Sequence, residues 1–175
     1  GFMRNQLGAF AVLLIGLLPM QIAMCNSGWA QVTSDRKATA DGLLEFGNQQ
    51  NDRDLALQSY KSALEIYRAI KDRNGEGKSL NNLGDVYRKQ ARLDKAIDYY
   101  KESLAIFKQI GDRTGEGRSL NNLGLVFQML GQYTKAIDFY QQSIALNKQI
   151  GNREQESTSL FNLGDVYRKQ ARLDK

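Results

Sequence analysis

Apolar residues recur at three- and four-residue spacing through most of the chain, the pattern of helices that bury one face. In one stretch these positions are Leu80, Leu83, Val86 and Tyr87. In the next they are Ala96, Ile97, Tyr100, Leu104, Phe107 and Ile110. The polar segment 90–92 separates the two stretches and supplies a short turn. The pattern therefore predicts an all-α chain built from antiparallel helix pairs.

The same helix pair is repeated every forty residues. Residues 72–84 align with 112–124, a third copy opens at Asn152, and a looser earlier copy ends with 56–70. We therefore expect a repeat domain over 31–175, with units at about 41–70, 71–110, 111–150 and, incomplete, 151–175. Since neither helix of a pair can bury its apolar face alone, the units must stack into a right-handed α-solenoid with a continuous core.

Glycines mark two kinds of position in each unit. Gly111 and Gly151 stand where a helix ends, and Asp112 can cap the helix that follows; Lys71 replaces glycine at the first junction, which we expect to be less well terminated. Three other glycines lie inside the first helix of successive units, where glycine is unfavourable: Gly84, Gly124 and Gly164. They predict close approach of the second helix, with Ala96 and Ala136 at the contact.

Residues 1–30 have the features of a secretory signal peptide. Arg4 gives a basic start, 7–18 is a continuous apolar run, and Gly28 and Ala30 occupy the −3 and −1 positions of a cleavage site. Gly1 and Phe2 precede the first methionine as extra residues. We expect a bacterial protein exported to the periplasm or the medium, with Gln31 as its mature N-terminus and no membrane segment after cleavage.

Two other interpretations of this segment stay open. A retained membrane anchor is one, because residues 22–24 extend the apolar stretch beyond Pro19. A lipoprotein is the other, since the residues before Cys25 resemble a lipobox, although Met24 stands where a small residue is usual.

The composition of the chain excludes most of the common catalytic sites. The chain contains no histidine and one cysteine, so it offers no Ser-His-Asp or Cys-His pair, no internal disulfide and no histidine-containing zinc site. The net charge of +5 is dispersed among acidic residues rather than gathered into a basic patch, which argues against nucleic acid as a partner. We expect no enzyme activity, no cofactor and no metal.

The repeated residues resemble the tetratricopeptide repeat. The family pattern of a large apolar residue, Leu-Gly, an aromatic, Ala, an aromatic and a small residue is met by Leu80, Leu83, Gly84, Tyr87, Ala96, Tyr100 and Ser103. The forty-residue period and the GDRxGEG linker are similar to the Pins/LGN-type scaffolds and to bacterial, especially cyanobacterial, proteins that join such repeats to a caspase-like CHAT domain. The resemblance covers about 41–175.

The resemblance implies that the first helix of each unit lines a concave groove that binds a peptide or protein segment. Carried over by position, the groove residues are Lys78, Asn81, Asn82, Asp85, Arg88, Arg118, Asn121, Asn122, Leu125, Gln128, Thr158, Phe161, Asn162, Asp165 and Arg168. Asparagine amides can pair with a peptide backbone, and the cations with carboxylates. The alternative for the asparagines is hydrogen bonding between repeats, and for the charged residues a solvated surface.

The last unit stops where its second helix should begin, because 162–175 repeats 82–95 residue for residue. Two expectations follow: a fragment of a longer protein, or self-association through the open C-terminal repeat. Two functions accordingly remain: an exported interaction scaffold, or the N-terminal regulatory or sensing part of a larger effector such as a CHAT protease.

Overall fold

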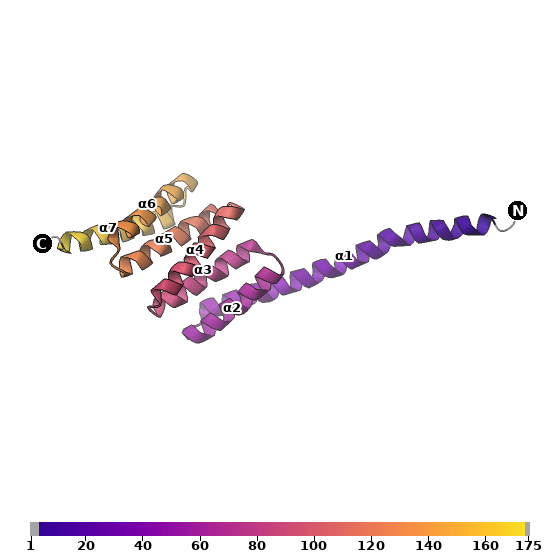
Figure 1. Ribbon diagram of the computed structural model, residues 1–175, viewed down its shortest axis with the longest axis horizontal. Coiled ribbons are helices and arrows are strands. Elements are labelled where there is room, and N and C mark those ends of the chain that lie inside the picture. The colour runs from indigo at the N-terminus through magenta and orange to yellow at the C-terminus, as the bar shows by residue number, and fades with distance from the viewer. Residues whose placement is uncertain (1–3, 174–175) are drawn as a thin grey trace. The chain divides into compact units, whose positions relative to one another are not determined.

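A computed structural model describes the backbone of residues 4–173 and the side chains of 27–172. Seven α-helices make up this described part, which contains no strand (Figure 1). They are α1 (Arg4–Gln49), α2 (Arg53–Ala69), α3 (Arg73–Lys89), α4 (Leu93–Ile110), α5 (Arg113–Met129), α6 (Tyr133–Ile150) and α7 (Arg153–Leu173). The all-α fold that the periodicity predicted is confirmed.

The chain divides into two units, 1–38 and 39–175. The helix α1 runs through the expected signal segment, but the side chains of 1–26, which include the basic start and the apolar run, lie outside the described residues. Within the searched part of the structure, none of the helices has the length and apolarity needed to cross a membrane.

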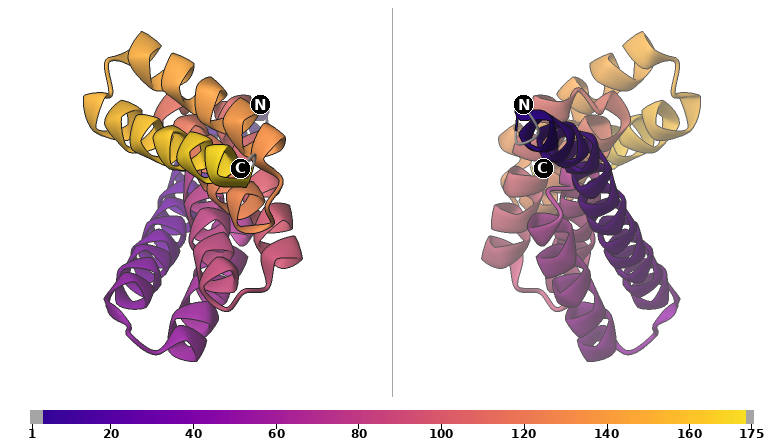
Figure 2. Two further views of the ribbon diagram at one scale, coloured as in Figure 1. Left: turned by 90° about the vertical axis from the view of Figure 1, so that its left-hand side faces the viewer. Right: turned by 90° about the vertical axis from the view of Figure 1, so that its right-hand side faces the viewer.

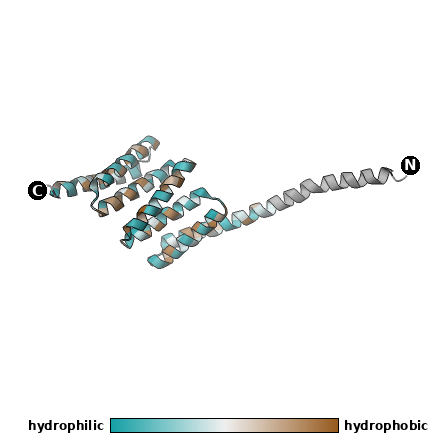
Figure 3. Cartoon of the chain, viewed as in Figure 1, coloured by the Kyte–Doolittle hydropathy of each residue, from teal (hydrophilic) through white to brown (hydrophobic). Residues whose placement is uncertain are grey.

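In the second unit the helices pack as successive antiparallel pairs (Figures 1 and 2). The end of α1 pairs with α2, α3 pairs with α4, and α5 with α6, while α7 packs on α6 as the next first helix. We call α3, α5 and α7 the A helices and α2, α4 and α6 the B helices. Apolar and polar stripes alternate along them, as amphipathic helices require (Figure 3).

The junctions between pairs share one geometry. Gly111 and Gly151 adopt the left-handed conformation, and the Asp112 carboxylate accepts a hydrogen bond from the Gly115 N–H. Lys71 takes the same left-handed conformation, with φ of 60°, and Asp72 caps the next helix in the same way. The first junction is therefore terminated like the others, with a non-glycine residue held in a conformation that costs about 1–2 kcal/mol.

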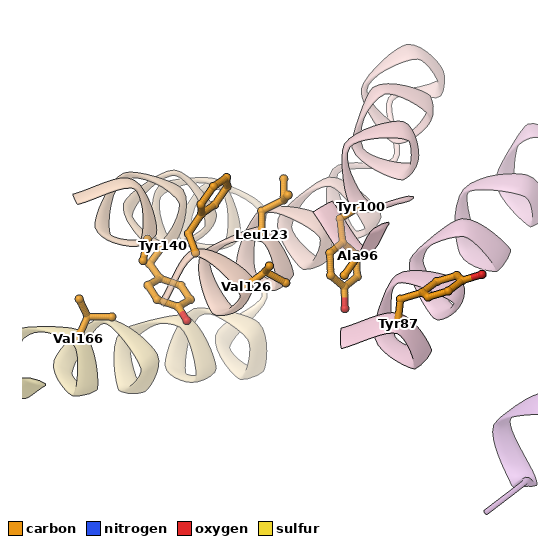
Figure 4. Packing of buried hydrophobic residues seen from close by; sticks show 9 residues of the cluster. Tyr87, Ala96, Tyr100, Leu123, Val126, Tyr140 and Val166 are labelled. Atoms are coloured by element: carbon orange, nitrogen blue, oxygen red, sulfur yellow. The ribbon is translucent and has the colours of Figure 1, made fainter. Parts of the chain in front are cut away.

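Each A–B pair is centred on a tyrosine ring that lies against a glycine. A Cβ added to Gly84 would lie 2.6 Å from the Tyr100 ring, and one added to Gly124 would lie 2.6 Å from the Tyr140 ring. Both tyrosines are fully buried (Figure 4). The predicted close approach is present, but the tyrosine ring occupies the space beside the glycine, where the sequence suggested Ala96 and Ala136.

Asparagines join one A helix to the next. The Asn81 amide donates to the Ser119 hydroxyl at 3.0 Å, and its carbonyl accepts from Asn122 at 3.1 Å. One repeat later, the Asn121 carbonyl accepts from Ser159 at 3.1 Å and from Asn162 at 3.0 Å. We call these bonds the asparagine ladder. Because Asn81 and Asn122 are buried, the ladder satisfies polar groups that water cannot reach.

We expect Gly124→Ala to destabilise the chain and Gly164→Ala to stabilise it. The added methyl in the first variant must displace the buried Tyr140 ring, and such overpacking costs about 1–3 kcal/mol. A methyl on Gly164 meets nothing within 4 Å, so only the gain in helix propensity remains, about 1 kcal/mol. Urea unfolding followed by circular dichroism measures both; a shift of the same sign in the two variants would contradict the tyrosine–glycine contact.

We expect Asn122→Ala to lower the free energy of unfolding by about 1–3 kcal/mol, because it leaves the buried Asn81 carbonyl without its donor. Asn82→Ala is the matched control. The Asn82 amide donates to Asn48 at an exposed position, so its loss should cost only about 0.5 kcal/mol. Thermal melts of the two variants test the ladder, and equal losses would show that it contributes nothing specific.

Candidate functional site

The tyrosines of the B helices carry polar atoms to the surface of the A helices. The Tyr60 hydroxyl donates to Asn48 at 2.9 Å and the Tyr100 hydroxyl to Asp85 at 2.7 Å. Tyr140 does the same to Gln128 at 2.8 Å. One ring per repeat thus fills the core with its body and fixes a groove side chain with its tip.

Burial raises the pKa of Tyr100 and of Tyr140 well above the ordinary range of a phenol. The charge of Asp85 raises the pKa of Tyr100 further, and that of Asp165 acts on Tyr140. Both hydroxyls therefore stay protonated and act as donors. A phenol that keeps its proton supplies no general base, so these buried tyrosines act as structural hydrogen-bond donors.

Charged side chains extend this network along the A helices. Asp85 accepts from Arg88 at 3.3 Å within α3. Gln128 on α5 donates to Asp165 on α7 at 2.6 Å, and Asp165 also pairs with Lys169, at 2.9 Å, and with Arg168. Lys169 first, and Arg168 with it, lower the pKa of the Asp165 carboxyl. The carboxylate is charged and tied to two helices.

The structure separates the predicted groove residues into two sets. All five asparagines hydrogen-bond other side chains: Asn81, Asn82, Asn121, Asn122 and Asn162. This is the inter-repeat arrangement that the sequence left open, and it buries Asn81 and Asn122. The remaining predicted residues are half-buried or exposed: Lys78, Asp85, Arg88, Arg118, Leu125, Gln128, Thr158, Phe161, Asp165 and Arg168. Their role in peptide binding stays a prediction.

A cavity lies between the first two repeats. Its volume is about 650 Å³, and its lining comprises Gly47, Asn48, Gln50, Asn51, Arg53, Ala56, Tyr60, Asn82, Asp85, Val86 and Lys89. Sequence reasoning found only Asn82 and Asp85 among these. The other residues belong to the loosely matching first repeat and its turn, where no repeat pattern marks them.

A smaller cavity of about 120 Å³ lies between α5 and α7 and is lined by Arg118, Asn121, Gln155 and Thr158. Two polar atoms here, Arg118 Nε and Gln155 Oε1, are buried and have no hydrogen-bond partner within the described part of the chain. Buried polar atoms normally have partners. The lining of this cavity therefore includes one unpaired donor and one unpaired acceptor from the described residues.

Among the described residues, no three side chains of the histidine, cysteine, aspartate or glutamate type lie close enough together to hold a metal ion.

This architecture is similar to that of known proteins. A family model described as the tetratricopeptide repeat matches residues 46–109 and 111–175. Comparison with curated proteins finds no match to this sequence.

Several solved structures are similar to the chain. Aspartyl phosphate phosphatase F from Bacillus subtilis is 16% identical with a TM-score of 0.73; the match covers 79% of this chain and 37% of that one. A signal transduction ATPase with a tetratricopeptide repeat sensor, from Pyrococcus horikoshii, is 24% identical with a TM-score of 0.69, covering 77% and 21%. The tetratricopeptide repeat domain of Arabidopsis FLU is 26% identical with a TM-score of 0.55, covering 69% and 98%.

The chain thus spans about a third and a fifth of the first two of these proteins, and nearly the whole of the third. The family match covers most of the sequence and coincides with the stacked helix pairs, their glycine–tyrosine contacts and their shared junctions. The chain belongs to the tetratricopeptide repeat family.

Proposed function

We propose that this protein is an exported interaction scaffold that binds an extended segment of another protein along the surface of its A helices. The observation that carries the proposal is the unpaired donor and acceptor at the cavity between α5 and α7. In an extended segment one residue presents its carbonyl and its N–H on the same side of the chain. The Arg118 Nε–H donates to the carbonyl, and Gln155 Oε1 accepts from the N–H, so a bound backbone would satisfy both buried atoms.

Charge supports an acidic occupant. Four of the predicted groove residues are cations: Lys78, Arg88, Arg118 and Arg168. Only Asp85 and Asp165 oppose them among the predicted groove residues, and both are already held by Arg88, Arg168 or Lys169. The remaining positive charge favours a segment rich in aspartate and glutamate, for which arginine supplies charge-assisted hydrogen bonds.

A regulatory or sensing part of a larger effector is the second candidate. The comparison that favours it is the Pyrococcus horikoshii ATPase, in which the similar repeats are a sensor and make up a small part of the protein. Both candidates use the same groove and assign no catalysis to the repeats. They differ in whether binding a segment is the protein's whole task or the signal for another domain.

We expect Arg118→Lys to weaken peptide binding about tenfold, a loss of about 1.4 kcal/mol. Lysine keeps the positive charge but has no Nε–H donor beside Gln155. The probe is an array of twelve-residue extended peptides with graded Asp and Glu content, followed by titration of the strongest binder by fluorescence anisotropy.

Arg113→Lys is the matched control, because Arg113 pairs with Glu116 and Gln149 away from the cavity. Equal affinity in the Arg118 and Arg113 variants would discard the backbone-pairing site. Binding that is independent of the acidic content of the peptide would discard the acidic partner.

Export predicts a mature chain that begins at Gln31. Expression in a bacterial host, fractionation and N-terminal sequencing of the protein test it, and Ala30→Arg should block processing because a large charged residue cannot occupy the −1 position. An unprocessed chain in the membrane fraction would support the retained anchor. A mature chain starting with a lipid-modified Cys25 would support the lipoprotein, and recovery of the unprocessed chain in the cytosol would contradict export.

A further inference from the structure

The middle unit differs from its two neighbours at the end of its A helix and in the turn that follows. Residues 82–95 and 162–175 are identical, whereas the aligned residues 122–135 differ from them at 125 and at 127–134. Except for Phe127, every changed residue of the middle unit is half-buried or exposed. The units therefore share one core and differ in the surface that they present.

The changes replace charges with apolar or uncharged side chains. Every charged residue of 82–94 has an uncharged counterpart in the middle unit: Leu125, Gln128, Met129, Gln132 and Thr134. Leu130 replaces a glutamine, Met129 is 51% exposed and Leu130 is 38% exposed. Exposed apolar side chains that lie together are typical of interaction sites, and methionine suits binding surfaces because its side chain adapts to its partner.

These apolar residues lie on the groove side of α5. The cavity between the first two repeats is lined by four residues from one face of α3: Asn82, Asp85, Val86 and Lys89. Leu125 and Met129 are the counterparts of Asp85 and Lys89, and one helical turn separates them, so their side chains are neighbours. Leu125 packs against the core, and Met129 extends the apolar surface outward. We call Leu125, Met129 and Leu130 the central apolar patch.

The exposure of the patch belongs to its position in the repeat. Lys89, the counterpart of Met129, is exposed as well, although α5, α6 and α7 all follow it along the stack. The helix that carries the patch packs against an A helix on each side, α3 and α7. The patch is therefore flanked by two further A helices of the groove surface.

Each neighbouring A helix places a net positive charge at the positions that flank the patch. In α3 the Asp85 carboxylate pairs with Arg88, while Lys89 forms no ion pair within the described residues. In α7 one carboxylate, that of Asp165, pairs with an arginine and a lysine. From α3 to α7 the surface is thus positive, then apolar, then positive.

We infer that the central apolar patch binds a large aliphatic side chain in the middle of the bound segment, with acidic residues on both sides of it. An acidic residue at the centre would lose water against apolar side chains and gain no cation. Packed helices lie about 8–10 Å apart and an extended chain advances about 3.3 Å per residue, so the acidic residues lie about three residues from the aliphatic one. This inference rests on the proposed function, because it specifies the sequence of the same segment.

Two labelled peptides of equal composition test the order of these residues. The first has a central leucine and a pair of glutamates about three residues away on each side. The second has the glutamates at the centre and the leucine at one end. We expect the full chain to bind the first about tenfold more tightly, because only that order places the leucine on the patch and the carboxylates beside the cations. Fluorescence anisotropy measures both affinities.

A double variant, Leu125→Asp with Met129→Lys, gives the middle unit the residues of its neighbours and leaves the net charge unchanged. It should fold, because α3 carries the same two residues at these positions, and circular dichroism checks that it does. We expect it to bind the leucine-centred peptide about tenfold more weakly and to lose the preference for that peptide. Thr114→Asn is the matched control: it also gives α5 a residue of α3, but at the opposite end of the helix, and it should bind as the parent does.

Met129→Lys alone separates the patch from a general effect of charge. The added cation would strengthen binding of either acidic peptide if charge alone determined affinity. Because the variant removes an apolar contact, we expect weaker binding of the leucine-centred peptide and no weakening for its isomer.

Equal affinity of the parent for the two peptides, or of the parent and the double variant for the first, would overturn the central patch. The proposed groove would survive that result if Arg118→Lys still weakened binding, whereas failure of the parent to bind either peptide would overturn both. Sedimentation velocity of the unliganded chain tests the other occupant. A dimer that the double variant dissociates would show that a second copy covers the patch, and would overturn its assignment to a separate segment.

Discussion

The contact on which the second unit depends is the one between a B-helix tyrosine and an A-helix glycine. With only hydrogen at the glycine, the two helices approach closely enough to enclose a complete aromatic ring. The glycine weakens its own helix by about 1 kcal/mol, and burial of the tyrosine offsets that loss because a fully buried aromatic residue stabilises by about 1.5–3 kcal/mol. A helix pair without its tyrosine keeps the helix weakened by glycine and loses the stabilisation that the buried ring provides.

The same contact organises the groove. Because each ring enters from the B helix, its hydroxyl emerges between the A helices and meets a polar side chain there. Packing thus determines where Asp85 and Gln128 are held. The asparagine ladder joins neighbouring A helices, and its amides are therefore no longer available to bind a ligand in the groove. What the surface offers a ligand is therefore set by the cations that neither system employs, such as Arg118, whose buried Nε has no partner among the described residues.

Much of the fold could be predicted from the sequence because the same pattern of apolar residues and glycines occurs in three successive units. The spacing of Leu80, Leu83 and Tyr87 defines a helix face without reference to any neighbour, and Gly111 and Asp112 specify a local junction. The partner of Gly84 was less certain, since a one-dimensional pattern places Ala96 and Tyr100 on the same face of α4 without saying which side chain reaches the glycine. The sequence also could not predict which asparagines are buried between the repeats. Asn81 and Asn82 are adjacent and chemically identical, and only the position of the next helix decides that Asn81 is buried and that Asn82 stays at the rim.

The identical segments 82–95 and 162–175 show how far local sequence determines local structure. Val86 and Val166 are both buried, because the stack on one side of each helix is the same. Asp85 and Asp165 differ: the first accepts from Tyr100, whereas the second accepts from Gln128 of the preceding repeat. The middle repeat has Leu125 and Gln128 where its neighbours have aspartate and arginine. Because no aspartate at position 125 pairs with residue 128, the Gln128 amide donates to Asp165 on α7 instead. A substitution in one unit thus changes the charge environment of the next, and a repeat surface of nearly uniform sequence acquires distinct positions along its length.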